Sequence, residues 1–173
     1  MATLATTLVS VEEYLSSSYR PDCDYIDGEL RQKKMADFDH GRLQALLVVA
    51  LHPLERQYSL WTATEARVQV NSRRYRVPDL TVARGPARPP RILIDPPLLC
   101  VEILSPTDTL EGVQERVDDY LAMGVPFVWF LSPRSRRGWI HTPDGIKEAK
   151  DGILRTSNPD LAIPLSALFD DQP

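Results

Sequence analysis

Hydrophobic side chains recur at helical spacing in two long segments of the chain. The first helix is predicted from about Asp37 to Leu51, and Pro53 should end or kink it. Its apolar face is made by five side chains, Leu43, Leu46, Leu47, Ala50 and Leu51. The second helix is predicted from about Thr109 to Met123, with Gly124 as its C-cap.

Other segments carry the signals of strands and turns. Near the N-terminus a capping box of Ser10 and Glu13 predicts a short helix to about Ser17. After it, Asp27-Gly28 is a hairpin turn signal between short strands at 24–26 and 29–32. Residues 66–70 alternate between apolar and polar, Asn71-Ser72 turns the chain, and a strand from Tyr75 to Val82 should run back.

The second half of the chain predicts a βαβ unit. After the proline-rich connection of residues 85–97, apolar runs at 98–104 and 127–131 read as buried strands on either side of the second helix. Such a unit should be right-handed. Shorter strands are expected at 138–141 and 153–155, around two Asp-Gly turns, and a short helix or tail from Pro164.

Composition is that of an ordinary soluble protein of 173 residues, long enough for one domain with a full core. No apolar run reaches the ~18 residues of a membrane span, and the N-terminus lacks the pattern of a signal peptide. Cys23 and Cys100 have no CxxC spacing. We therefore expect a cytoplasmic protein. The net charge of −4 does not by itself indicate a nucleic-acid binder.

Two acids interrupt apolar runs near the ends of predicted strands. Asp79 lies in segment 76–82, and Glu102 lies in segment 98–104, just before Ser105-Pro106. A buried acid is costly unless it is paired or binds a cation. Acids on neighbouring strands could together hold Mg²⁺, which prefers oxygen ligands, and this would indicate phosphoryl transfer. The alternative is one acid exposed at a strand end and the other ion-paired.

Arginine is the commoner basic residue, and it clusters at 73–76 and 134–137. These clusters are interpreted either as phosphate contacts or as solvated loops. A further arginine, Arg116, falls inside the apolar arc of its predicted helix at ~100° per residue, so it should point toward the sheet or its edge. It either snorkels out of the core or brings a cation toward Glu102.

Several short motifs follow one another in a specific order. They are Tyr-Ile-Asp-Gly-Glu-Leu at 25–30, His40 opening a helix, Val-Pro-Asp at 77–79, Val-Glu-Ile-Leu-Ser-Pro at 101–106, Tyr-Leu-Ala-Met-Gly-Val-Pro at 120–126 and Val-Trp-Phe-Leu at 128–131. This set resembles the putative restriction endonuclease family within the PD-(D/E)XK nuclease superfamily. The resemblance implies one nuclease-like domain over residues 1–173. Its fold would be α/β, a restriction-endonuclease-like core with a mixed β-sheet flanked by helices, plus an N-terminal helix and β-hairpin.

The resemblance also implies a site. Asp79 and Glu102 match the two metal-binding acids, which would hold Mg²⁺ or Mn²⁺ with help from the Ile103 carbonyl. His40 would contact phosphate or a metal-bound water, although a histidine near a helix start is also a common exposed cap residue. Glu29 and Glu65 are weaker candidates for a third carboxylate.

The chain departs from the superfamily pattern at its lysine. The position two after the second acid is Leu104, and the family position in the following helix is Arg116. The four lysines, Lys33, Lys34, Lys147 and Lys150, lie outside this motif region. Arginine keeps the positive charge that a phosphorane-like transition state needs, but it is a poor general base.

Two functions follow from these observations. The leading interpretation is a metal-dependent endonuclease whose partner is DNA, with Asp79, Glu102, Arg116 and His40 as catalytic residues and no membrane association. A two-fold dimer would suit a duplex substrate. The alternative is a nuclease-fold protein, catalytically weakened by Arg116, that binds nucleic acid or a protein partner.

Overall fold

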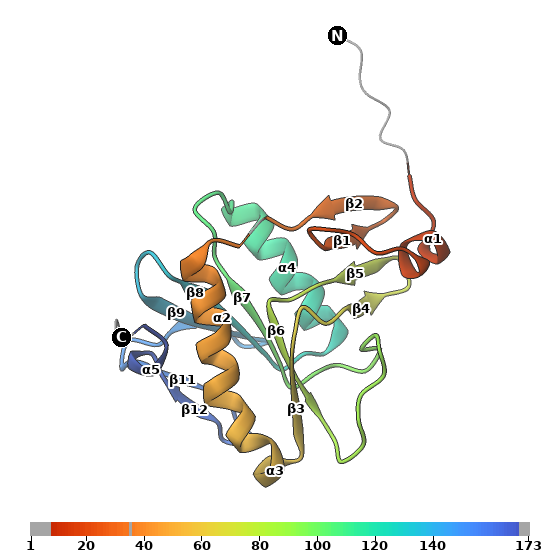
Figure 1. Ribbon diagram of the computed structural model, residues 1–173. Helices are drawn as coiled ribbons and strands as arrows, with labels where there is room; N and C mark the ends of the chain where they lie inside the picture. The colour runs from red at the N-terminus through yellow and green to blue at the C-terminus, as the bar shows by residue number, and fades with distance from the viewer. Residues whose placement is uncertain (1–7, 35, 170–173) are drawn as a thin grey trace.

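The fold is built around a mixed six-stranded sheet in the order β10-β9-β8-β7-β6-β3. A computed structural model describes residues 8–34 and 36–169 (Figure 1). The strands are β3 (Leu60–Thr64), β6 (Leu80–Arg84), β7 (Leu99–Ile103), β8 (Phe127–Ser132), β9 (Arg137–Thr142) and β10 (Gly145–Glu148). Strands β7 and β8 are parallel and the other neighbours are antiparallel. This is the mixed sheet that the sequence predicts.

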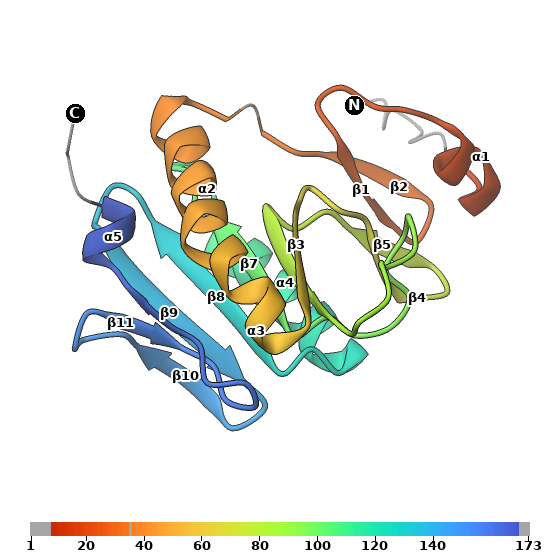
Figure 2. The same cartoon turned by 60° about the horizontal axis from the view of Figure 1, so that its bottom comes forward.

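Two long helices cover opposite faces of this sheet (Figure 2). Helix α2 (Phe38–Leu51) contributes Leu43, Leu47 and Leu51 to one apolar core, whereas α4 (Leu110–Met123) contributes Val117 and Tyr120 to another. The side chains of β7 alternate between these cores, because successive residues of a strand point to opposite faces. Val101 and Ile103 lie in the α2 core, and Cys100 lies in the α4 core. Glu102 therefore points toward α4.

Both long helices have the caps that their sequences indicate. Asp37 caps α2 by accepting from the His40 N–H, and Thr109 caps α4 by accepting from Gly112. Gly124 ends α4 with a φ of 102°, a left-handed conformation that glycine adopts without strain. Pro53 lies in a 3₁₀ turn (η1, His52–Leu54) that joins α2 to the short α3 (Glu55–Tyr58), so the expected end of α2 is confirmed.

A second, four-stranded sheet is formed by strands from residues 23–76, in the order β2-β1-β5-β4. It contains β1 (Cys23–Ile26), β2 (Glu29–Gln32), β4 (Val68–Asn71) and β5 (Arg74–Arg76). The predicted hairpin turn is present, with Asp27 and Gly28 at φ of 51° and 101°. Helix α1 (Val11–Ser16) is capped by Ser10 and packs its buried Tyr14 against Tyr25 and Tyr75.

The expected single strand from Tyr75 to Val82 is wrong. The chain leaves the small sheet after β5, passes through Val77, Pro78 and Asp79, and enters the large sheet as β6. Proline has no N–H to donate to a strand ladder, which favours a break at this point. The physical consequence is that Asp79 lies at the junction between the two sheets.

The first arginine cluster is divided, because the Arg73 side chain is 72% exposed in a turn whereas the less exposed Arg74 and Arg76 are held in closer ion pairs. Arg76, which is buried, bridges Asp24 at 2.9 Å and Asp119 at 2.6 Å. Arg74 bridges Asp27 at 2.8 Å and the same Asp119 at 3.0 Å. These ion pairs join the small sheet to α4.

The C-terminal part extends the large sheet and adds a small one. Strands β9 and β11 (Ile153–Arg155) confirm the expected short strands, while β10 and β12 (Ala162–Pro164) were not foreseen. Helix α5 (Ser166–Phe169) confirms the expected short helix, and the tail after it lies outside the described residues. Within residues 8–34 and 36–169, no helix is long and apolar enough to cross a membrane.

Candidate active site

The backbone brings the two predicted acids to adjacent positions. Asp79 directly precedes β6, Glu102 lies within β7, and the antiparallel register pairs their neighbours Leu80 and Val101. Both side chains are buried and line one cavity of about 270 Å³. Asp79 Oδ2 also accepts from the N–H of Ile103, the residue after Glu102, at 2.6 Å. The carbonyl of Ile103 as a metal ligand stays a prediction.

A lysine that the sequence analysis did not place here is the nearest cation to Asp79. Lys33, just after β2, contacts Asp79 Oδ1 through its Nζ at 2.6 Å and donates to the Val77 carbonyl at 2.5 Å. The hairpin turn fixes Lys33 relative to β1, but its contact with Asp79 depends on the pairing of β1 with β5. That pairing joins segments far apart in the sequence, so no local pattern could have revealed the contact.

Lys33 and Asp79 hold each other in their charged forms. Burial, the largest effect on Lys33, favours the neutral amine, but the charges of Asp79 and Glu102 outweigh it and raise the pKa of Lys33. Burial likewise opposes ionisation of Asp79, yet Lys33 and His40 lower its pKa to about 2. Lys33 is therefore a fixed positive charge and a poor general base.

His40 lies beside Asp79, and its expected contact with phosphate or a metal-bound water stays a prediction. Its Nε2 is 3.4 Å from Asp79 Oδ1, at the start of α2, and its side chain is largely covered. The hydrogen bond with Asp79, the largest effect, raises the pKa of His40. Gln44, one turn further along α2, donates to the Asp79 carbonyl at 2.7 Å. Helix α2 thus contacts both the side-chain carboxylate and the backbone carbonyl of Asp79.

Glu102 has a different environment from Asp79. The Tyr120 hydroxyl donates to its Oε1 at 2.6 Å, and Arg116 Nε lies 3.5 Å from its Oε2. Burial is the largest effect and raises the pKa of Glu102 to about 7, with Asp79 adding to the rise and Lys33 and Arg116 opposing it. Two acids with separated pKa values in one cavity are typical of functional sites.

Arg116 points where its helical position predicts. Besides Glu102 it contacts Asp108 Oδ1 at 3.2 Å, and Asp108 is also 3.6 Å from Lys34 Nζ. Its buried Nε has no hydrogen-bond partner among the described residues. This nitrogen lies 3.5 Å from Glu102 Oε2, so Arg116 and Glu102 interact as an ion pair and not through a hydrogen bond. Tyr120, one turn further along α4, shares the same helix face, which is the signal that could have added it to the site.

The weaker candidates lie elsewhere. The side chains of Glu29 and Glu65 are exposed and do not line the cavity of the two acids. Leu104, at the superfamily lysine position, packs against the α4 core. Among residues 8–34 and 36–169, no group of three His, Cys, Asp or Glu side chains is arranged to hold a metal ion.

The two acids offer the type of oxygen donor that a divalent cation binds. Mg²⁺ is commonly bound through one or two carboxylates and several waters, and Asp79 and Glu102 supply such oxygens. The oxygens are nevertheless already contacted by the chain itself, through Lys33, the Ile103 amide, Tyr120 and Arg116. A cation at Asp79 would compete with Lys33 for the same oxygen.

Comparisons with known proteins identify the fold and the family of the chain. No curated protein matches the chain. Among solved structures, a crystal structure titled as a putative nuclease belonging to DUF820 from Anabaena variabilis ATCC 29413 superposes with a TM-score of 0.77. The two are 21% identical, and the match covers 93% of this chain and 97% of that one, which establishes the shared fold. The family Uma2, described as putative restriction endonuclease, matches residues 11–167, and the chain therefore belongs to that family.

Proposed function

We propose that this protein is a metal-dependent DNA endonuclease of the PD-(D/E)XK superfamily. The observation that carries the proposal is the cavity itself, in which two buried acids from neighbouring strands meet two cations from other elements. Membership of the putative restriction endonuclease family supports a nuclease. Asp79 and Glu102 would hold Mg²⁺ or Mn²⁺, which when bound supplies an activated water and offsets the charge of the scissile phosphate.

The chain's own residues supply charge and position. Lys33 is held protonated by the acids, so it can contact a phosphate oxygen but not remove a proton. Arg116 lines the same cavity beside Glu102, and a guanidinium binds phosphate well. Lys33 thus gives the site a lysine from the segment just after β2, although the superfamily position two residues after Glu102 holds Leu104.

His40 and Tyr120 position the acids. His40 contacts Asp79 Oδ1 at 3.4 Å and Tyr120 donates to Glu102 Oε1 at 2.6 Å. Burial raises the pKa of Tyr120 well above its ordinary value, so its hydroxyl keeps its proton and remains a donor. DNA would enter from the open side of the cavity, and a two-fold dimer would let two such sites address both strands.

One observation favours the second function, a nuclease-fold protein that binds nucleic acid without cutting it. The acids are already neutralised by Lys33 and Arg116, which weakens the case for a bound metal. In that event the protein would bind DNA but leave it intact whatever divalent cation is present.

A nuclease assay with metal titration separates the two functions. Supercoiled plasmid incubated with the protein in Mg²⁺ or Mn²⁺ should be nicked or linearised, and EDTA should prevent this. Asp79→Ala, purified in parallel, should lose the activity, whereas Asp95→Ala, which changes an exposed acid outside the site, should keep it. Equal cleavage by parent and Asp79→Ala would show a contaminating nuclease, and binding without cleavage would establish the second function.

A further inference from the structure

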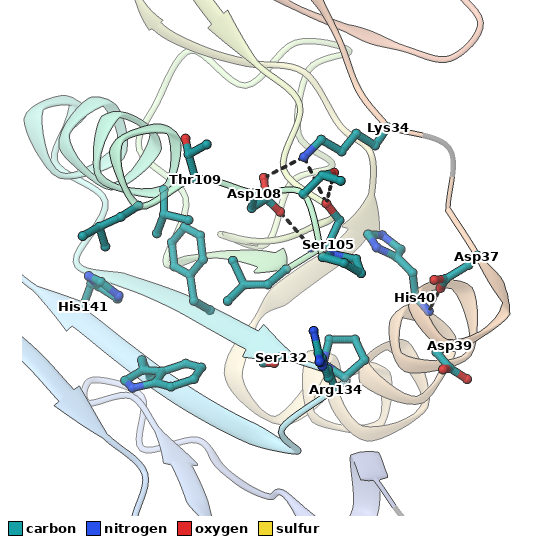
Figure 3. Close-up of a pocket in the computed structure, with 18 of the residues that line it drawn as sticks. Lys34, Asp37, Asp39, His40, Ser105, Asp108, Thr109, Ser132, Arg134 and His141 are labelled. Atoms are coloured by element: carbon teal, nitrogen blue, oxygen red, sulfur yellow. Dashed lines mark hydrogen bonds and ion pairs between the residues drawn. The ribbon is translucent and has the colours of Figure 1, made fainter.

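A second, larger cavity of about 950 Å³ borders the site of the two acids (Figure 3). It lies where β8, β9 and β10 extend the sheet beside the start of α4. The register places Trp139 opposite Phe130 and His141 opposite Val128 and Ile146, and cross-strand partners point to the same face. Helix α4 covers another part of the same face of the sheet, since Phe130 and Val128 belong to the α4 core. The floor is therefore aromatic and aliphatic.

The cavity is open to solvent despite its apolar walls. Leu110, at the first turn of α4, is 83% exposed, and Ile146 of β10 is 61% exposed. Large exposed apolar side chains gathered around a hollow mark a binding surface. The rim includes Lys34 and Arg134, labelled in Figure 3. Three carboxylates, Asp37, Asp39 and Asp108, also line the cavity and are unfavourable toward a polyanion, although Asp108 is ion-paired with Lys34 and Arg116. The cations are placed to contact the phosphates on either side of a bound group.

A buried histidine points to a ligand with polar edges. His141 is only 6% exposed, yet its Nδ1 has no hydrogen-bond partner among the described residues. Its ring packs against Phe130 with a centroid distance of 5.2 Å, and both rings line the cavity. Burial lowers the pKa of His141, which keeps the ring neutral and able to donate or accept one hydrogen bond.

The two cavities adjoin each other. Six residues line both, namely Lys34, His40, Ser105, Thr107, Asp108 and Thr109. A nucleic-acid strand with a phosphate at Asp79 and Glu102 would therefore have a neighbouring base beside the larger cavity. A base in a duplex is stacked and paired, so it could enter only if unpaired or flipped.

We propose that this cavity receives an unpaired nucleobase, which stacks on Trp139 and the Phe130–His141 wall and hydrogen-bonds to His141. The substrate class would be DNA with an unpaired nucleotide, such as a single strand, a flap or a flipped base. This proposal rests on the proposed function, because it takes the strand to be the one whose phosphate lies at the acids.

Binding can be measured without cleavage, in EDTA, by fluorescence anisotropy of a labelled single strand of about 10 nucleotides and of its blunt duplex. The parent should prefer the single strand. Trp139→Ala should weaken single-strand binding about tenfold, the effect of losing one base–aromatic stack. Its matched control is Trp61→Ala, since Trp61 is 37% exposed and lies outside the cavity.

A second pair of variants guards against misfolding of Trp139→Ala. Leu110→Glu places a charge at the exposed rim and should weaken binding strongly, whereas Ile94→Glu, equally apolar and 61% exposed outside the cavity, should change it less than about twofold. If the cavity variants weaken binding of both the single strand and the duplex while the control variants do not, the proposal is also supported, because the duplex would then place a flipped base in the cavity.

The inference and the proposed function fail in different ways. Cavity variants that bind and cut single strands like the parent would overturn the inference and leave the nuclease intact. A blunt duplex bound more tightly than a single strand, with no effect of Trp139→Ala, would also overturn it. A parent that neither binds nor cuts any DNA would overturn the proposed function, and the inference with it.

Discussion

The Lys33→Met substitution tests whether the acids depend on an internal cation. Methionine keeps most of the aliphatic length of lysine but removes the ammonium that lies 2.6 Å from Asp79 Oδ1 and 2.5 Å from the Val77 carbonyl. The Asp79 side chain is 4% exposed, so water cannot replace the lost charge. The variant therefore keeps a buried carboxylate with only the Ile103 amide and His40 as partners.

The expected loss of stability can be bounded from two directions. Removing one partner of a buried ion pair typically costs about 3–5 kcal/mol. The pKa of Asp79, lowered from 3.8 to about 2, corresponds to about 2 kcal/mol of net stabilisation at neutral pH. We expect Lys33→Met to lower the free energy of unfolding by about 3 kcal/mol, near the meeting point of these two figures.

The pKa of Asp79 determines how the free energy of unfolding changes with pH. In the parent its lowered pKa gives stability that is present above about pH 4 and is lost as pH falls toward 2. In the variant burial raises this pKa instead, so protonation in mild acid relieves the strain of the unpaired charge. The gap between parent and variant should shrink as the pH is lowered from neutral.

Urea unfolding followed by tryptophan fluorescence, with and without Mg²⁺, measures these effects. Mg²⁺ should restore part of the stability of Lys33→Met, because a cation can then take the place of the ammonium. Lys34→Met is the matched control, since the Lys34 side chain is 47% exposed and its surface ion pair should contribute at most about 1 kcal/mol. Equal, small losses in both variants and no response to Mg²⁺ would refute the role of Lys33 as counter-ion.

Three further predictions concern the same cavity. Glu102→Gln should increase the free energy of unfolding by up to about 3 kcal/mol near pH 8 and by little near pH 5, because the pKa of Glu102 is raised from 4.5 to about 7 and its buried charge is costly only above that pH. An equal effect at both pH values in urea unfolding would contradict this. Mg²⁺ or Mn²⁺ should raise the melting temperature of the parent, and Asp79→Asn should abolish most of that rise, unless the ion binds elsewhere. In plasmid cleavage with Mn²⁺, Arg116→Lys should keep or increase the rate and Arg116→Ala should lose it; an unchanged rate in folded Arg116→Ala would make Arg116 purely structural.

Local patterns were enough to predict the elements that make the frame. The Asp27-Gly28 turn, the Gly124 C-cap of α4 and the βαβ unit depend on residues close in sequence, and each is present. Helical periodicity also placed Arg116 on the face that meets Glu102. The two acids were found because charges within apolar runs are conspicuous.

What the sequence did not reveal depends on distant pairings. Lys33 reaches Asp79 only because the hairpin pairs with β5, and the apolar run at 75–82 gave no sign that two sheets would share it. The ion pairs of Arg76 with Asp24 and Asp119 are equally invisible in a linear pattern. The apolar cavity beside α4 was missed because Phe130, Trp139 and His141 gather only when β8 pairs with β9.

The passage of the chain from one sheet to the other at Pro78 gives the site a hinge-like dependence on the small sheet. Lys33 directly follows β2 of the small sheet, Glu102 lies within β7 of the large one, and the Arg76–Asp119 ion pair joins the small sheet to α4. If the small sheet unfolds locally, Lys33 moves away from Asp79 at the junction of the two sheets, while Glu102 stays within β7 of the large sheet. The rate at which a cation from solution reaches Asp79 would then be set by the rate at which the small sheet opens. Weakening the Arg76 ion pairs would increase that rate.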